Sequence, residues 1–354
     1  MSTRQYKILF FAIGILTMTV LVYNTGWRSI VVNIAAMGYW FLPVIGSWLI
    51  IYLLNAWAFY DIIREKDNPQ TKLSFGEILQ LTITGYAINY VTPFVGLGGE
   101  PYRVMEMAPR LGIAKASSSV LQYGLMHMLA HVVFWLASII LIVTRPDLDS
   151  FLLAGCLILL LTGLTLGYLF IKIYRKGFLV AVLSHVSRWP FVGKKAGDLL
   201  STHYETLQRI DEQLTALYAY RKPVFFQALF LEFAARIVGC VEIYSIGIAT
   251  GLDMSWFDAV IVSSGSSLFA NLVFFFPMQL GTREGGMALA LRAVGLPAGT
   301  GVFISLVTRI RELVWIVVGY ALLYGKERNK KIALKEQKPL STQKISQNDQ
   351  GHII

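Results

Sequence analysis

Four charged residues lie beside glycine- and proline-rich breaks in otherwise apolar sequence: Glu100, Arg103, Arg283 and Glu284. An arginine fork and the free amides of a helix N-terminus both bind phosphate well, so Arg103 and Arg283 are candidate phosphate ligands. The glutamates could form ion pairs with these arginines, or could receive a cationic group or a coupling proton. Neighbouring polar, glycine and proline residues complete this candidate substrate site: Asn89, Pro93, Gly98, Gly99, Asn271, Pro277, Gly281 and Gly285.

Further ionisable residues lie inside long apolar runs, where they are costly unless they pair or face a polar cavity. Arg309, Arg311 and Glu312 extend the candidate substrate site into the last run. His127 and His131 are one helical turn apart, as are Glu232 and Arg236, so a local ion pair is expected of the latter. These four residues are either hydrogen-bonded packing groups or a polar relay.

The sequence lacks the motifs that are typical of metal sites, ATPases and hydrolases. The histidine spacing could hold a metal, but no HExxH pattern and no third ligand accompany it, so we predict no metal site. The chain has no GxxxxGK[ST] loop and no GxSxG elbow, which argues against an ATPase or a hydrolase. We therefore predict a protein that is not an enzyme and needs no cofactor.

Composition sets the class of protein. Of 354 residues, 55% are hydrophobic and only 15% are charged, whereas soluble domains carry about 25% charged residues. Two cysteines are too few for a disulfide scaffold. The net charge of +10 is explained by basic loops beside anionic lipid, so no nucleic-acid partner is expected. The sequence predicts an all-α polytopic membrane protein.

Six apolar runs are long enough to cross a bilayer, which takes about 20 residues. They are 8–23, 38–60, 115–143, 151–171, 224–248 and 302–324. Two further apolar regions, 75–110 and 256–296, are interrupted by glycine and proline and become too short to cross after the interruption. We predict that each forms a re-entrant helical hairpin. The expected breaks are at Pro93, Gly96, Gly98, Gly99 and Pro101, and at Pro277, Gly281, Gly285 and Gly286.

The distribution of basic residues predicts which side of the membrane each segment faces. They concentrate in 61–74, in 172–222 and after Tyr324, which predicts that these segments and both termini are cytoplasmic. Segment 172–222 mixes apolar and charged residues in the manner of amphipathic helices on the membrane surface. We expect a membrane domain over 1–325 and a basic, disordered tail over 326–354.

The two broken regions repeat one another. In both, a proline precedes a glutamate by seven residues, and a long apolar run follows. The pseudo-repeats cover about 75–143 and 256–324. Because the predicted hairpins enter from opposite sides, the repeats would have inverted topology, a design that places transporter sites at the membrane midplane.

The stretches from Asn89 to Arg103 and from Pro277 to Gly286 resemble the paired signatures of a flippase-like family, which includes the transmembrane part of lysylphosphatidylglycerol synthase. The resemblance covers about residues 5–325. It implies a multi-pass protein of the bacterial cytoplasmic membrane whose partners are lipids with anionic or lipid-linked head groups. The synthase's soluble aminoacyltransferase domain does not follow here, so a separate synthase could make the substrate. Glu100 and Pro101 depart from the family's first signature.

Three functions remain open. The first is the flipping of a phospholipid or lipid-linked head group through a midplane cavity between the two broken-helix hairpins. The second is secondary transport of a small soluble anion. The third is a lipid-modifying transferase, for which Glu100 or Glu284 would be the catalytic carboxylate. The sequence predicts no oligomeric state.

Overall fold

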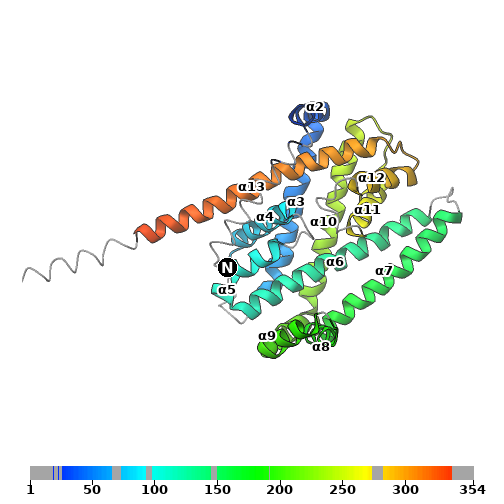
Figure 1. The fold of residues 1–354 in the computed structure, drawn as a ribbon. Coiled ribbons are helices and arrows are strands. Elements are labelled where there is room, and N and C mark those ends of the chain that lie inside the picture. The colour runs from blue at the N-terminus through cyan, green and yellow to red at the C-terminus, as the bar shows by residue number, and fades with distance from the viewer. Residues whose placement is uncertain are drawn as a thin grey trace, which may run out of the picture.

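The computed structural model describes residues 19, 23, 26–65, 73–92, 98–144, 150–190, 192–272 and 282–336 (Figure 1). Within these ranges the regular elements are all helices. They are α2 (Trp27–Met37), the short 3-10 helix Gly38–Trp40, α3 (Phe41–Ile63), α4 (Phe75–Val91), α5 (Gly99–Leu111), α6 (Ile113–Val143), α7 (Ser150–Lys176), α8 (Leu179–Val186), α9 (Gly193–Tyr220), α10 (Lys222–Ala249), α11 (Trp256–Leu272), α12 (Thr282–Ala293) and α13 (Thr300–Glu336).

Four helical segments are long and apolar enough to cross a membrane: Val31–Ile63, Ile113–Val143, Leu153–Lys176 and Lys222–Ala249. They coincide with four of the six predicted spans, and the chain is a multi-pass membrane protein. Predicted span 8–23 lies outside the described residues. Predicted span 302–324 lies within α13, where three charged side chains interrupt the apolar run. This helix continues to Glu336, into the segment that the sequence predicted to be disordered.

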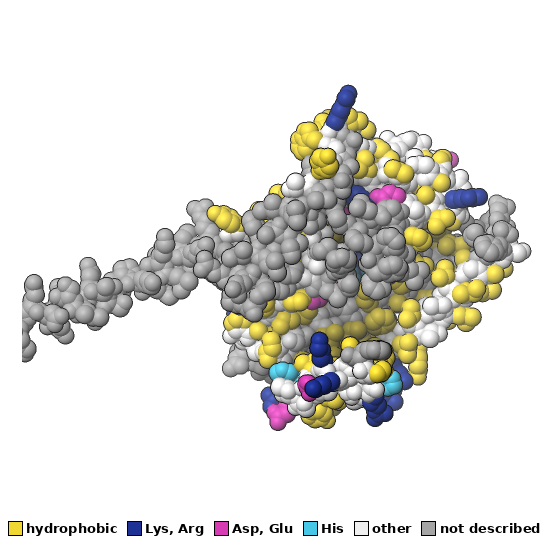
Figure 2. All heavy atoms as spheres, viewed as in Figure 1, with side chains coloured by type: hydrophobic (Ala, Val, Ile, Leu, Met, Phe, Trp, Pro, Cys, Tyr) yellow, Lys and Arg dark blue, Asp and Glu magenta, His cyan; other side chains and the backbone are white. Residues whose placement is uncertain are grey.

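Helix α7 has the surface expected of a helix in lipid. Its apolar side chains are largely exposed, with Leu157, Ile158 and Leu161 exposed by 49%, 64% and 66%. In water such a surface would be unfavourable, but hydrocarbon solvates it as well as a protein core does. Figure 2 shows hydrophobic side chains spread widely over the visible face, with charged ones gathered around α8 and α9.

Helices α3 and α10 form the antiparallel centre of the fold (Figure 1). At one end, the Arg221 guanidinium before α10 donates to the carbonyls of Asp61 and Ile62 at 2.7 and 3.1 Å. These carbonyls belong to the last turn of α3, where helix acceptors otherwise lack partners. Towards the other end, Trp48 Nε1 of α3 donates to Glu242 Oε2 of α10 at 2.7 Å.

Two pairs of short helices, α4 with α5 and α11 with α12, occupy the predicted hairpin regions. Both pairs begin with reciprocal caps: Ser74 with Glu77, and Ser255 with Asp258. The extent of the breaks differs from the prediction, because Gly99–Pro101 and Gly285–Gly286 lie inside α5 and α12. Gly98 immediately precedes α5, and the remaining predicted break residues, Pro93, Gly96, Pro277 and Gly281, lie outside the described residues.

Glycines let the paired helices approach closely. A Cβ at Gly99 would lie 2.2 Å from the Gly85 carbonyl oxygen, and one at Gly286 would lie 2.9 Å from Phe269 Cβ. Two other glycines end the pairs in a left-handed conformation, with φ +77° at Gly112 and +78° at Gly295. These four glycines therefore serve backbone packing and turning.

The two halves contact each other in matching ways. Helix α3 packs on α4 as α10 packs on α11, and α13 crosses onto α4 as α6 crosses onto α11. The α4–α13 crossing is especially close, since a Cβ at Gly319 would lie 2.4 Å from Ala87 Cβ and 3.2 Å from the Ile83 carbonyl oxygen.

This crossing gives a stability prediction. Gly319→Ala should lower the free energy of unfolding by about 1–3 kcal/mol, the usual cost of overpacking. Gly325→Ala on the same helix is the matched control, because a Cβ there meets nothing within 4 Å. Chemical unfolding of both variants in detergent micelles measures the difference. Equal stabilities would show that α13 does not pack on α4 through Gly319.

Segment 172–222 contains helices α8 and α9, which one carboxylate holds together. Asp211 accepts from the backbone amides of Phe178, Leu179 and Val180, each at 3.0 Å. This satisfies the otherwise unpaired amides at the start of α8. Gln213 of α9 accepts from Ser118 of α6 at 2.5 Å, which ties the pair to the membrane helices.

Candidate functional site

The first helix pair carries a small polar cluster where α4 meets α5. Asn89 Oδ1 accepts from the Gly99 amide at 2.6 Å, and its Nδ2 donates to Glu100 Oε1 at 3.1 Å. Arg103 Nη1 lies 3.5 Å from the same Glu100 oxygen. Glu100 is the exposed member of this ion pair, at 31%, while Arg103 is only 2% exposed.

Aromatic rings enclose the Arg103 guanidinium. Its central carbon lies 6.0, 5.2 and 5.4 Å from the ring centres of Phe59, Tyr86 and Tyr123. Ring faces attract cations, particularly where water is excluded. Gly85 leaves the space for this side chain, since a Cβ there would lie 2.5 Å from Arg103 Nε. Arg103 is thus held inside the protein, behind the more exposed Glu100.

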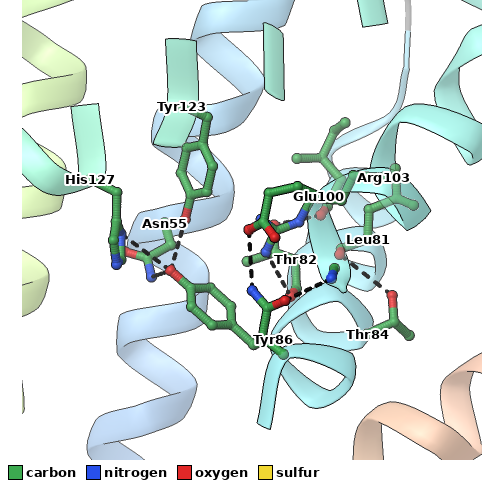
Figure 3. A network of polar contacts seen from close by, with 12 residues as sticks. Asn55, Leu81, Thr82, Thr84, Tyr86, Glu100, Arg103, Tyr123 and His127 are labelled. Atoms are coloured by element: carbon green, nitrogen blue, oxygen red, sulfur yellow. Dashed lines mark hydrogen bonds and ion pairs between the residues drawn. The ribbon is translucent and has the colours of Figure 1, made fainter. Parts of the chain in front are cut away.

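His127 is the centre of a second cluster, which Tyr86 links to Arg103 (Figure 3). Its Nδ1 lies 2.8 Å from Glu232 Oε2 and 3.2 Å from the Tyr86 hydroxyl. Arg236 Nη2 lies 2.7 Å from His127 Nδ1 and 2.9 Å from Nε2. The Tyr86 hydroxyl also contacts the hydroxyl of Tyr123 and accepts from the amide of Asn55, both at 3.1 Å.

We call these residues the His127 network: Asn55, Tyr86, Asn89, Glu100, Arg103, Tyr123, His127, Glu232 and Arg236. They come from α3, α4, α5, α6 and α10. The predicted local ion pair is present, with Arg236 Nη2 at 3.2 Å from Glu232 Oε2. Glu232 is fully buried, and a buried carboxylate needs compensation of this kind.

A second group of charges links α10, α12 and α13. Arg311 binds Glu242 through two bonds, Nε to Oε1 at 2.9 Å and Nη2 to Oε2 at 3.2 Å. Trp48 covers this pair, with its ring centre 3.6 Å from the Arg311 guanidinium. The Arg311 and Glu242 side chains are 4% and 6% exposed, so this bidentate pair is thoroughly desolvated.

Helix α12 contributes two adjacent charges that both reach α13. Arg283 Nη1 donates to Glu312 Oε1 at 2.6 Å. Arg309 donates to Glu284 Oε1 through Nε at 3.1 Å and Nη2 at 2.9 Å. Arg311 Nη1 also lies 3.5 Å from the Tyr90 hydroxyl. We call Trp48, Tyr90, Glu242, Arg283, Glu284, Arg309, Arg311 and Glu312 the Arg311 network. Its three arginines and three glutamates cancel in charge, which offsets part of the cost of burying them.

The two networks differ in how completely their polar atoms are satisfied. Within the described part of the chain, Glu100 Oε2, Arg103 Nε and Arg236 Nε are buried without a hydrogen-bond partner. No buried charged atom of the Arg311 network is in that state there. Unsatisfied charged atoms are costly in a low dielectric. The His127 network therefore has buried donors and acceptors that are still available for binding, whereas the buried charged atoms of the Arg311 network already have partners.

An aromatic side chain joins the two networks. The Tyr52 ring centre lies 5.8 Å from that of Trp48 and 5.5 Å from that of Tyr86. Tyr52 is itself buried, with Trp315 at 4.8 Å on a further side. The charges of both helix pairs thus lie around one aromatic cluster on α3 and α4.

Some predicted site residues lie elsewhere. His131 contacts Ser267 of α11 at 3.3 Å, and its ring centre is 5.3 Å from that of His127. Asn271 donates to the Ser267 carbonyl of its own helix. Gly98 precedes α5, and a Cβ at Gly285 would meet nothing within 4 Å. Pro93, Pro277 and Gly281 lie outside the described residues.

Five aromatic and amide members of the networks were not predicted as site residues. These are Trp48, Asn55, Tyr86, Tyr90 and Tyr123. Asn55 was detectable, because it is an isolated amide in an apolar run. The tyrosines and Trp48 resemble ordinary packing residues until the helices are placed together. In the described residues, no group of three or more His, Cys, Asp or Glu side chains is placed to hold a metal.

Comparison with known proteins gives one match. A family model described as the lysylphosphatidylglycerol synthase TM region matches residues 7–319. That range includes every member of both networks. No curated protein and no solved structure matched the chain.

Proposed function

Because this chain belongs to the family of the lysylphosphatidylglycerol synthase transmembrane region, we propose that it flips a phospholipid or lipid-linked head group across the bacterial cytoplasmic membrane. The family links the protein to the membrane and to lipid metabolism or transport. We propose in addition that the protein moves the lipid itself and acts as a transporter, not as an enzyme. In this proposal the head group passes between the two helix pairs.

One observation carries the proposal: the helix pairs present partly exposed charges beside compensating charges on long apolar helices. Glu100, Glu284 and Arg283 are 31%, 26% and 20% exposed. His127, Glu232 and Arg236 lie near the middle of α6 and α10. A purely structural bundle has no need of ionisable groups at such positions, where each is expensive. The passage of a polar head group would explain why the protein has ionisable groups at these positions.

The arrangement of the halves supports the same idea. The corresponding helices α3 and α10 run antiparallel, and the contacts of one half match those of the other. If both halves span the bilayer, this relation corresponds to an inverted repeat with both termini cytoplasmic. In transporters of that design, broken helices meet at the midplane site and the halves rock around it. Acyl chains would remain in lipid beside helices such as α7.

Proteoliposomes test the proposal. They would contain fluorescent NBD-labelled phosphatidylglycerol, whose outer-leaflet share is bleached by dithionite. We expect the reconstituted protein to make nearly all of the label accessible, and protein-free vesicles to lose only the outer share. Uptake of radiolabelled inorganic phosphate, measured in parallel, addresses transport of a soluble anion. Phosphate uptake without lipid movement would contradict flipping and favour the soluble-anion transporter.

A further inference from the structure

His127 lies between a group that can only donate and a group that can only accept. Arg236 carries donors alone, and the Glu232 carboxylate, when ionised, carries acceptors alone. Glu232 Oε2 lies 2.8 Å from Nδ1, and Arg236 Nη2 lies 2.7 Å from Nδ1 and 2.9 Å from Nε2. A neutral imidazole has one N–H and one lone pair, so it can serve both neighbours at once. It does so when Nδ1 holds the hydrogen.

A second proton changes this arrangement. Protonation of Nε2 removes the ring's remaining acceptor and makes the imidazole a cation. The imidazolium keeps its bond to Glu232, but Arg236 Nη2 then has a cation in place of an acceptor. At 2.9 Å, inside a protein, this repulsion is strong. Arg236 then keeps only its ion pair with Glu232, at 3.2 Å, and its remaining donors can turn towards another anion.

Arg236 is suited to such a change of partner. Its side chain is 16% exposed, and its Nε is buried without a hydrogen-bond partner in the described residues. A guanidinium binds a phosphate through two parallel bonds, which uses donors that are idle here. By contrast, Arg311 already makes two bonds to Glu242 and is 4% exposed.

We propose that His127 is the proton-binding site of this transporter and that its protonation releases Arg236 to bind the phosphate of the head group. The inference rests on the proposed function and deepens it, because it names the coupling ion and the anion-binding residue. A proton enters from the more acidic side and binds Nε2, and the phosphate then replaces the imidazole as the partner of Arg236. When the head group leaves on the other side, Nε2 returns its proton to water and Arg236 returns to His127.

The other groups around His127 are compatible with His127 being the group that binds the proton. Beyond Glu232 and Arg236 on α10, the groups that face it are Tyr86 of α4, Arg103 of α5, and Tyr123 and His131 of α6. The Tyr86 hydroxyl can donate or accept, so it can bond to either form of the ring. Arg103 is held by three aromatic rings, and His131 makes its own contact with Ser267. Neither of them is placed between His127 and Arg236.

A pH gradient across the proteoliposomes tests the inference. The probe is NBD-labelled phosphatidylglycerol, with the membrane potential clamped by potassium and valinomycin. In wild type, the ratio of labelled lipid between the two leaflets should shift by up to about tenfold for a gradient of about one pH unit. This is the thermodynamic limit for one proton moved with each head group. His127→Gln should lose this response. The exposed His185 of α8 gives the matched control, so His185→Gln should respond like wild type.

The outcomes separate this inference from the proposed function. Wild-type flipping that ignores every gradient would overturn proton coupling and leave flipping intact. No flipping under any gradient would contradict the proposed function itself. A gradient response retained in His127→Gln would assign the proton to another group and overturn the inference.

Binding measurements cover the case in which His127→Gln does not fold. Short-chain dihexanoyl phosphatidylglycerol is titrated into the detergent-solubilised protein at acidic and neutral pH. Wild type should bind it more tightly at acidic pH, by up to about tenfold per pH unit. Arg236→Gln should bind weakly at both values, and Arg236→Lys should recover part of the affinity. Equal affinity of wild type and Arg236→Gln would overturn the role of Arg236.

Discussion

Replacing Arg311 by alanine is expected to lower the free energy of unfolding by about 3–5 kcal/mol, the cost of removing one partner of a buried ion pair. The Glu242 carboxylate would lose both of its bonds to the guanidinium while remaining 6% exposed. The Trp48 indole would lose the cation that lies against its ring. Chemical unfolding in detergent micelles measures this loss.

An exposed ion pair gives the control for Arg311. Arg110 and Glu77 also pair closely, at 2.6 Å, but their side chains are 49% and 42% exposed. Arg110→Ala should therefore cost no more than about 1 kcal/mol. The double variant Arg311→Met/Glu242→Met should recover much of the loss, because no charge is left unpaired. If Arg311→Ala were as stable as Arg110→Ala, the buried pair would not hold α10 to α13.

The second large effect is expected on flipping. Glu284→Arg places a second guanidinium against Arg309, in the position where a carboxylate now accepts two bonds. Helix α12 should then separate from α13, and flipping should fall by more than about tenfold, a barrier increase of about 1.4 kcal/mol. The exchange Glu284→Arg/Arg309→Glu restores opposite charges and should recover most of the rate. The dithionite assay on the three proteins makes the comparison.

Stability measurements accompany that comparison, so that a loss of flipping is not confused with unfolding. The single variant should remain folded, since Glu284 is 26% exposed and the new charge can reach water. Wild-type rates in the single variant would contradict a role for the α12–α13 contact in transport.

Local sequence patterns predicted the local features well. The Glu232–Arg236 pair follows from their spacing on one helix, and it is present at 3.2 Å. Four apolar runs coincide with helices able to cross a membrane. Gly112 and Gly295, which occupy matching places in the repeat, both adopt the left-handed conformation that glycine favours.

Contacts between helices could not be predicted from spacing. Arg309 and Glu312 are one turn apart and could have paired, yet Arg309 binds Glu284 and Glu312 binds Arg283. Both partners lie on α12, whose distance from α13 is set by tertiary packing. The same holds for Arg103, whose neighbours in the sequence do not reveal the three rings that enclose it. Likewise, the sequence does not reveal that Gly99 and Gly286, near the predicted breaks, have other helices against them.

The central claim is that a head group crosses the membrane between the two helix pairs, and photocrosslinking tests it most directly. Two phosphatidylglycerol probes would be reconstituted with the protein, one with a diazirine on the head group and one with a diazirine at the end of an acyl chain. Mass spectrometry then locates the labelled peptides. We predict that the head-group probe labels α5 and α12, around Glu100 and Glu284, and that the acyl-chain probe labels the exposed apolar surface of α7. Head-group labelling confined to α7 and the outer surface would contradict the account.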